Sequence, residues 1–183
     1  MKTASTKVRY GALSIGLHWF MLLLLVAVYA CMLFSSSFPK GSDTRAELKT
    51  WHYMLGLSVF VLAWIRLAIN LGSQTPPIEP APPAWQDWLA KLVKIAFYIL
   101  MIGLPVAGWL TLSANGQPIP FFGLQLPALM AENKNAAGWL KDIHETGATA
   151  GYFLLGLHAA AALFHHYVVR DNTLRRMLPG RST

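Results

Sequence analysis

Long apolar stretches with very few charges alternate along this chain with shorter polar segments. The charge-poor stretches are Tyr10 to Pro39, Thr50 to Leu71 with Arg66 as its one charged residue, the segment that follows Lys94, and Thr146 to Val169. A helix needs about 20 apolar residues to cross roughly 30 Å of hydrocarbon. The pattern therefore predicts four transmembrane helices, near residues 13–35, 51–71, 92–113 and 144–169.

The predicted fold class is all-α: an integral membrane four-helix bundle formed by a single domain over residues 1–183. Composition supports this, because 55% of the residues are hydrophobic, 13% are charged and the mean hydropathy is +0.42. A chain of this size cannot bury so much apolar surface in one soluble core. The first apolar stretch is longer than the hydrophobic region of a signal peptide and three more spans follow it, so we expect it to be retained.

Two connections between the predicted spans differ in character. Residues 72–91 contain a proline-rich run, Thr75-Pro76-Pro77-Ile78-Glu79-Pro80-Ala81-Pro82-Pro83, which predicts an extended cytoplasmic linker because proline disfavours helix at the preceding residue. Residues 114–143 are long for a loop, yet rich in apolar side chains. We expect them to lie along the outer surface of the bundle as a lid or interfacial helix.

The distribution of basic residues predicts the orientation in the membrane. If both termini share one side, that side holds ten of the 15 Lys and Arg residues: Lys2, Lys7, Arg9, Arg66, Lys91, Lys94, Arg170, Arg175, Arg176 and Arg181. The positive-inside rule then places both termini in the cytoplasm. Basic residues beside the spans also account for the pI near 9.8 without a nucleic-acid partner.

Four of the six histidines lie at the edges of, or inside, the predicted spans: His18, His52, His144 and His158. Imidazole in a bilayer is costly without a partner, so such residues are functional candidates. His52 and His144 each come three residues after a lysine at the outer end of a span, while His18 and His158 belong to the inner halves. The histidines therefore form two pairs at two depths.

On the fourth predicted helix, His144 and His158 are fourteen residues apart. This corresponds to about 21 Å of rise and a difference of about 40° in direction, so one helix face offers ligands at two depths. Gly147 and Gly151 share that face and would leave room for flat macrocycles. The alternative for these glycines is close helix packing, which on glycine alone is favoured.

Paired imidazoles at two depths suit bis-histidine haem, with one ligand on each side of the porphyrin. No Cys-x-x-Cys-His motif occurs, so the haem would be non-covalent and b-type. The alternatives for single histidines are helix capping, snorkelling and interhelical hydrogen bonds, and zinc would need a closed ligand cluster, which the sequence does not suggest. His165, seven residues after His158, competes with it as the partner of His18, and spacing leaves that choice open.

The segment from Gly156 to Tyr167 (GLHAAAALFHHY), followed by Asp171 to Met177 (DNTLRRM), resembles the C-terminus of the bacterial cytochrome b561 family. The match extends in order over nearly the whole chain, through His18-Trp19, His52, Thr75-Pro76-Pro77 and His144-Glu145-Thr146. The resemblance is closest to the small stand-alone members. It implies a four-helix dihaem cytochrome of the bacterial inner membrane, in which His52 and His144 hold the outer haem b and His18 and His158 the inner one.

Some members of that family are similar to superoxide oxidases, which oxidise superoxide outside and reduce ubiquinone within the membrane. The expected function is therefore superoxide:ubiquinone oxidoreductase, with two haem b groups as cofactors, ubiquinone as acceptor, and lipid and superoxide or a redox protein as partners. The first alternative is a cytochrome b subunit that links a dehydrogenase or hydrogenase to the quinone pool. The second is a non-redox proton or metal-ion carrier that uses the same histidines.

Further residues are expected to serve the two substrates. Lys49, Lys134 and Lys141 lie at the outer end and would steer an anion toward it, although neighbouring acids offset them and each lysine alone reads as solvated surface. His165 would donate a hydrogen bond and a proton to the quinone, with His166 next in line. Arg66 would be a second donor, and its alternative is a snorkelling anchor at the membrane interface.

Overall fold

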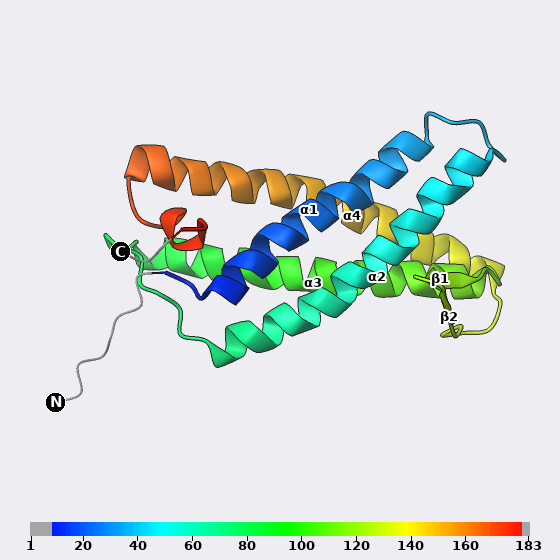
Figure 1. The fold of residues 1–183 in the computed structure, drawn as a ribbon, viewed down its shortest axis with the longest axis horizontal. Helices are drawn as coiled ribbons and strands as arrows, with labels where there is room; N and C mark the ends of the chain where they lie inside the picture. The colour runs from blue at the N-terminus through cyan, green and yellow to red at the C-terminus, as the bar shows by residue number, and fades with distance from the viewer. Residues whose placement is uncertain (1–8, 181–183) are drawn as a thin grey trace.

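Four long helices make up most of the computed structural model, which describes residues 9–180 (Figure 1). They are α1 (Ala12–Ser35), α2 (Asp43–Gly72), α3 (Ala84–Ala114) and α4 (Lys134–Phe164). A short hairpin of β1 (Ile119–Phe121) and β2 (Leu124–Leu126) joins α3 to α4, and α4 continues into the π-helical turn η1 (His165–Val169) and then a 3-10 turn η2 (Arg175–Met177). Each of the four long helices is long and apolar enough to cross a membrane, so the predicted all-α membrane bundle is confirmed.

Three of the helices begin 8–10 residues before the predicted spans, at Asp43, Ala84 and Lys134. Two of these starts are capped by side chains, since Ser42 accepts a hydrogen bond from the Arg45 amide and Asn133 accepts one from the Ala136 amide. The length of an apolar stretch predicts only the part of a helix that lies in the hydrocarbon of the membrane. The capping residues determine where the helix itself begins. The first turns of these helices consequently extend beyond the apolar segment.

These early starts shorten both connections. The proline-rich linker occupies only residues 73–83, because α3 begins directly after Pro83. The segment expected as a lid, residues 114–143, consists of the hairpin and the first turns of α4. The hairpin turns at Phe122 and Gly123, both with positive φ, and packs against α2, where the Phe122 amide contacts the Met54 sulfur at 3.4 Å.

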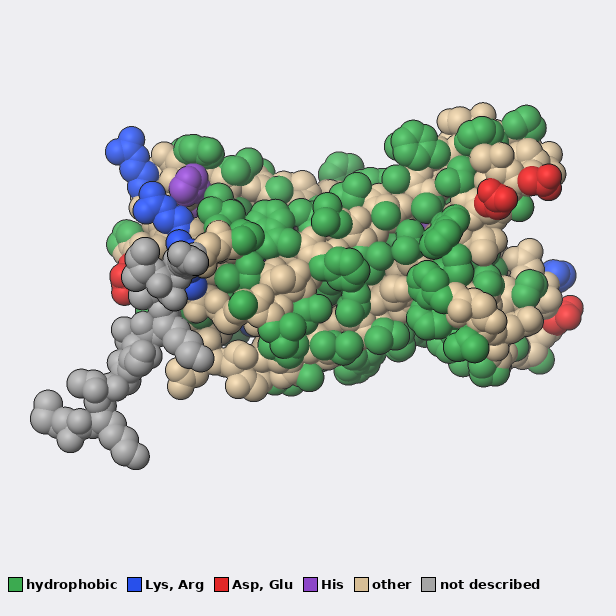
Figure 2. All heavy atoms as spheres, viewed as in Figure 1, with side chains coloured by type: hydrophobic (Ala, Val, Ile, Leu, Met, Phe, Trp, Pro, Cys, Tyr) green, Lys and Arg blue, Asp and Glu red, His purple; other side chains and the backbone are tan. Residues whose placement is uncertain are grey.

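The helices pack in chain order, α1 on α2, α2 on α3 and α3 on α4. A core of buried side chains joins the first three: Met21, Leu24, Val59, Ala63 and Met101. Figure 2 shows hydrophobic side chains over the middle of the visible face and the charged side chains gathered toward its two ends. An apolar belt of this kind is suited to lipid, where a helix must satisfy its own backbone polar groups.

The two ends of the described range, at Arg9 and Gly180, lie together at one end of the bundle, which we call the terminal end; the opposite end is the hairpin end. After η1 the chain reverses at Arg170, whose φ is 62°, and the following residues reach α1 and the proline-rich linker. The Tyr10 amide donates to the Arg176 carbonyl at 3.3 Å, and the Trp19 indole donates to the Met177 carbonyl at 2.7 Å. Three of the basic residues used for orientation, Lys2, Lys7 and Arg181, lie outside the described residues.

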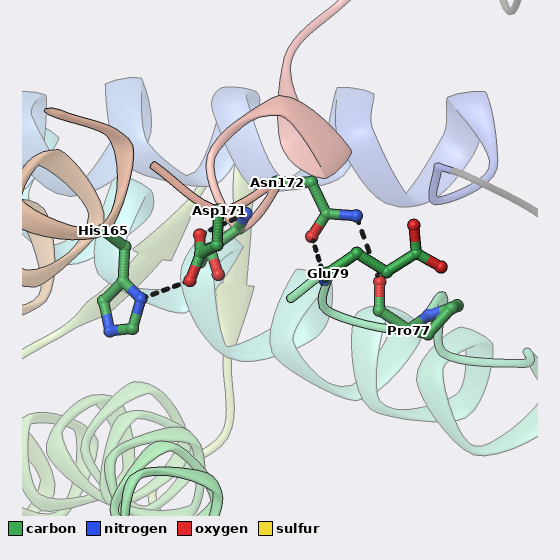
Figure 3. A network of polar contacts seen from close by, with 6 residues as sticks. Pro77, Glu79, His165, Asp171 and Asn172 are labelled. Carbon is green, nitrogen blue, oxygen red and sulfur yellow. Dashed lines mark hydrogen bonds and ion pairs between the residues drawn. The ribbon is translucent and has the colours of Figure 1, made fainter. Parts of the chain in front are cut away.

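The reversed segment is tied to the proline-rich linker (Figure 3). The Asn172 side chain accepts from the Glu79 amide at 3.0 Å and donates to the Pro77 carbonyl at 3.3 Å, and the Asn172 amide donates to the Glu79 carbonyl at 3.2 Å. Arg176, which is buried, donates to the Pro76 carbonyl. The C-terminal segment thus closes the terminal end against α1 and the linker.

The Asn172 contacts predict a local effect on this closure. Asn172→Ala removes two side-chain hydrogen bonds, for a cost of about 1 kcal/mol, which corresponds to roughly fivefold faster hydrogen exchange at the Glu79 amide. Exchange measured by mass spectrometry in detergent checks this. Asn135→Ala, at an exposed position in the first turn of α4, is the control and should leave hydrogen exchange in the linker unchanged. Equal exchange at the Glu79 amide in both variants would contradict a stabilising contact between Asn172 and the linker.

Candidate haem-binding site

Two histidines face each other near the hairpin end. His52 is carried by α2 and His144 by α4, and their ring centroids are 6.0 Å apart with planes inclined by 73°. Both rings are partly buried. These two helices do not pack closely along their lengths, so the histidine pair is a principal point of approach between them.

A second pair lies nearer the terminal end. His18 of α1 and His158 of α4 have ring centroids 6.3 Å apart and planes inclined by 71°. Phe97 of α3 meets the His158 ring edge-on at 5.2 Å. The structure thus brings His158, and not His165, beside His18, which is the choice that spacing left open.

The spacing within each pair fits an iron between two imidazoles. A metal–imidazole bond is about 2 Å long and the ring centroid lies about 1.2 Å beyond the nitrogen, so two opposed ligands place their centroids about 6.4 Å apart. The observed separations of 6.0 and 6.3 Å are close to this value. Because both pairs use α4, about 21 Å of helix rise separates the two levels.

The rings at the hairpin end are oriented by backbone carbonyls. His52 Nδ1 lies 3.0 Å from the Val28 oxygen and His144 Nδ1 lies 2.8 Å from the Leu104 oxygen. A carbonyl only accepts, so each Nδ1 carries the proton and donates it, which leaves the Nε2 lone pair available for a metal. The chemistry of this donor set therefore suits haem iron.

Glycines set the close approach of α4 to its neighbours. A Cβ at Gly108 of α3 would lie 3.2 Å from His144 Cε1, so the bare backbone there makes room for that ring. A Cβ at Gly147 would lie 2.5 Å from Leu104 Cδ2, and one at Gly151 would lie 2.5 Å from the Tyr29 hydroxyl, which donates to the Ala148 carbonyl. Gly147 and Gly151 thus serve close helix packing, the alternative favoured from glycine alone.

Arg66 lies against the pair at the terminal end. Its Nη2 atom is 2.9 Å from His18 Nδ1, and its side chain is half-buried within α2. A guanidinium only donates, so in this arrangement His18 Nδ1 is the acceptor. The partner of this ring is therefore a cation, in contrast to the carbonyls at the hairpin end.

His165 has a different partner, Asp171, whose Oδ2 atom lies 2.6 Å from His165 Nδ1 (Figure 3). The Thr173 amide donates to the other carboxylate oxygen at 2.8 Å, and the Asp171 side chain is almost fully buried. Burial alone would raise the pKa of Asp171, but the hydrogen bonds from His165 and Thr173 outweigh it and lower that pKa. Sequence spacing could not reveal this pair, because the chain reverses at Arg170 between its members.

The three lysines expected to steer an anion lie at the hairpin end in mixed surroundings. Lys134 Nζ is 3.5 Å from the Asn115 carbonyl, while Lys141 forms an exposed ion pair with Glu145 at 3.4 Å. Lys49 is partly buried in α2. A shallow groove on the same helix is lined by Asp43, Ala46, Glu47, Thr50 and Trp51, so negative charge is also present at this end.

Comparison with known proteins assigns the family. The family model described as prokaryotic cytochrome b561 matches residues 9–180. Cytochrome b561 homolog 1 of Escherichia coli K12 is 42% identical over 173 residues, which cover 94% of this chain and 98% of that protein. The protein named probable superoxide oxidase CybB of Yersinia pestis is 37% identical over 171 residues, covering 93% and 96%, and cytochrome b561 homolog 2 of E. coli K12 is 27% identical over 184 residues, covering 100% and 97%.

The family match spans all the described helices, and the relatives are matched over nearly their full lengths. Proteins of this family bind b-type haem, which agrees with the paired imidazoles described above. The chain belongs to the prokaryotic cytochrome b561 family of multi-pass membrane proteins that carry electrons.

Proposed function

We propose that this protein is a superoxide oxidase that reduces ubiquinone in the bacterial inner membrane. The observation that carries the proposal is the presence of two histidine pairs at two levels along α4. In each pair the ring centroids have the separation expected for two imidazoles that bind one iron. Bound haem supplies a one-electron carrier at each level. A relative named as a probable superoxide oxidase, 37% identical over nearly the whole chain, supports the choice of substrate.

In this proposal His52 and His144 hold the outer haem b, and His18 and His158 hold the inner one. The hairpin end faces the periplasm and the terminal end faces the cytoplasm, because the terminal end carries the excess of Lys and Arg. The Val28 and Leu104 carbonyls hold the outer rings with Nε2 toward the metal. Electrons would thus enter at the hairpin end and leave near the terminal end.

The reaction balances as two one-electron oxidations and one two-electron reduction. Two superoxide anions each lose an electron to give two O₂ molecules, while ubiquinone gains two electrons and two protons to give ubiquinol. Lys49 and Lys134 would attract the anion to the hairpin end, and Lys141 contributes less because Glu145 neutralises it. The chain itself therefore has to bind an anion at one end and supply protons near the other.

His165 is the proposed proton donor and hydrogen-bond partner of the quinone. Its Nδ1 atom is held by Asp171 at 2.6 Å, which fixes the ring and leaves Nε2 to face a substrate. With both ring nitrogens protonated, Nδ1–H would donate to Asp171 and Nε2–H to the quinone, which would take that proton as it is reduced. Arg66, expected as a second donor, lies against His18 and would reach only a quinone placed beside that histidine.

The runner-up is an electron-transfer subunit that serves a partner dehydrogenase or hydrogenase. This alternative function remains in consideration because the E. coli relative that is 42% identical, cytochrome b561 homolog 1, has a name that specifies no reaction. Family membership favours either redox function over a proton or metal-ion carrier.

Haem ligation predicts a reciprocal pattern of losses. His52→Ala or His144→Ala should remove one haem, and His18→Ala or His158→Ala the other, because each pair holds its own iron. Haem per protein and low-temperature spectra of the purified variants measure this. His166→Ala is the control and should keep both haems; a His158→Ala protein with two haems, together with loss of one in His165→Ala, would refute the inner assignment.

Superoxide should reduce the purified protein directly. In stopped-flow experiments, b-type absorbance bands should appear rapidly, and raising the ionic strength should slow them because anion attraction is screened. Replacing Lys49 and Lys134 together by Gln should slow reduction roughly two- to tenfold, whereas Lys91→Gln, whose lysine pairs with Asp87 on α3, should not. Reduction by dithionite but not by superoxide would favour the electron-transfer subunit.

Quinone reduction should depend on His165. His165→Ala should lower superoxide-driven ubiquinone turnover by about a hundredfold or more, while both haems are kept and still reduced rapidly. Asp171→Asn should lower turnover to a smaller extent, because the ring remains but loses its anionic partner. Tyr167→Phe, at an exposed position in the same turn, serves as the matched control and should keep normal turnover. Normal turnover in His165→Ala would place the quinone elsewhere, and loss of turnover in His166→Ala would then point to His166.

A further inference from the structure

Three of the four paired histidines have a partner at Nδ1, the ring nitrogen that would point away from a bound metal, and the kind of partner differs between the two ends of the bundle. At the hairpin end both Nδ1 atoms face uncharged backbone carbonyls, at 3.0 and 2.8 Å. At the terminal end His18 Nδ1 faces the Arg66 guanidinium at 2.9 Å. One pair therefore has neutral acceptors around it and the other has a full positive charge.

Arg66 has no anion to neutralise it among residues 9–180. The ionic contacts within this range are Lys91 with Asp87, Lys141 with Glu145 and His165 with Asp171. The titratable groups that face Arg66 are the phenols of Tyr10 and Tyr98 and the rings of His18 and His158. Phenols and imidazoles carry no negative charge near neutral pH, and a half-buried cation in a membrane span is costly without a counter-ion.

The contact between Arg66 and His18 cannot persist unchanged when His18 binds iron. A neutral imidazole has one lone pair and one N–H, so a ring that gives its Nε2 lone pair to iron carries its proton on Nδ1. That proton and the Arg66 N–H groups cannot hydrogen-bond to each other, and the guanidinium needs another acceptor. The carboxylates that haem itself carries, its propionates, are anions of the kind that arginine binds well.

We propose that Arg66 is the charge partner of the haem held by His18 and His158, binding a propionate and raising the reduction potential of that site above that of the site at the hairpin end. This inference rests on the ligand pairs of the proposed function. It also accounts for a cation within the span of α2 that has no anionic partner among residues 9–180.

The two kinds of ring partner act in opposite directions. A carbonyl that accepts from Nδ1–H makes the imidazole a stronger donor, which favours oxidised iron and lowers the potential. A nearby positive charge favours the reduced iron, which has one positive charge less. Together they give electrons a favourable direction along α4, from the hairpin end toward the terminal end, where quinone is proposed to be reduced.

The test is a potentiometric titration of the Arg66→Gln protein, with chemical mediators and dithionite and with neither superoxide nor quinone present. In the His52→Ala background only the haem of the terminal end remains, so its potential is read alone. Arg66→Gln should lower that potential by the equivalent of at least a tenfold change in the ratio of reduced to oxidised haem, about 59 mV for one electron. Arg66→Lys, which keeps the charge, should recover most of this shift.

Lys94→Gln is the matched control, since it removes a cation exposed on α3 toward the same end and should leave the potential unchanged. An unchanged or raised potential in Arg66→Gln overturns the proposal, as does an equal fall in Arg66→Lys. If Arg66→Gln loses haem, selective loss of one haem from the protein with His52 intact, restored by Arg66→Lys, supports the proposal, and loss of both haems overturns it. These measurements do not depend on superoxide, so failure of the oxidase activity would be a separate result.

Discussion

The packing of α4 against the α3 backbone is the constraint on which the rest of the site depends. Gly108 lets the His144 ring approach α3, and Gly147 lets Leu104 approach α4. This contact sets the position and direction of α4, which carries one histidine of each pair. In a membrane, where lipid is as apolar as the side chains, such close backbone approach replaces the hydrophobic effect as the force that joins helices.

Once α4 is placed, each of its histidines meets a ring from another helix, at the hairpin end from α2 and at the terminal end from α1. Few other contacts join α4 to those helices; one is the Tyr29 hydroxyl on the Ala148 carbonyl. The two histidine pairs therefore lie between helices that make few other contacts with each other.

At the terminal end, the C-terminal segment covers the bundle and also brings polar side chains together. The reversed C-terminal segment contacts α1 through Trp19 and the proline-rich linker through Asn172. The same reversal buries Asp171 against His165, so a carboxylate and an imidazole meet near the membrane boundary. At the hairpin end, in contrast, the charged groups are of both signs, and the Lys141–Glu145 pair is exposed to solvent. The two ends thus differ in character, with a partly buried imidazole–carboxylate pair at one and solvent-exposed ion pairs at the other.

The sequence alone determined the four apolar helices and the two depths of histidine, because hydrocarbon thickness sets helix length and helical periodicity sets the face. The sequence pattern did not predict that the helices begin at Asp43, Ala84 and Lys134, because the length of an apolar stretch carries no information about caps and turns outside the membrane. Spacing left open whether His158 or His165 lies beside His18; the tertiary structure shows His158 there, as the family resemblance implied, and it alone shows that Arg66 faces that pair. Such choices depend on which helices pack together and on a chain reversal at Arg170, and neither follows from spacing along a single helix.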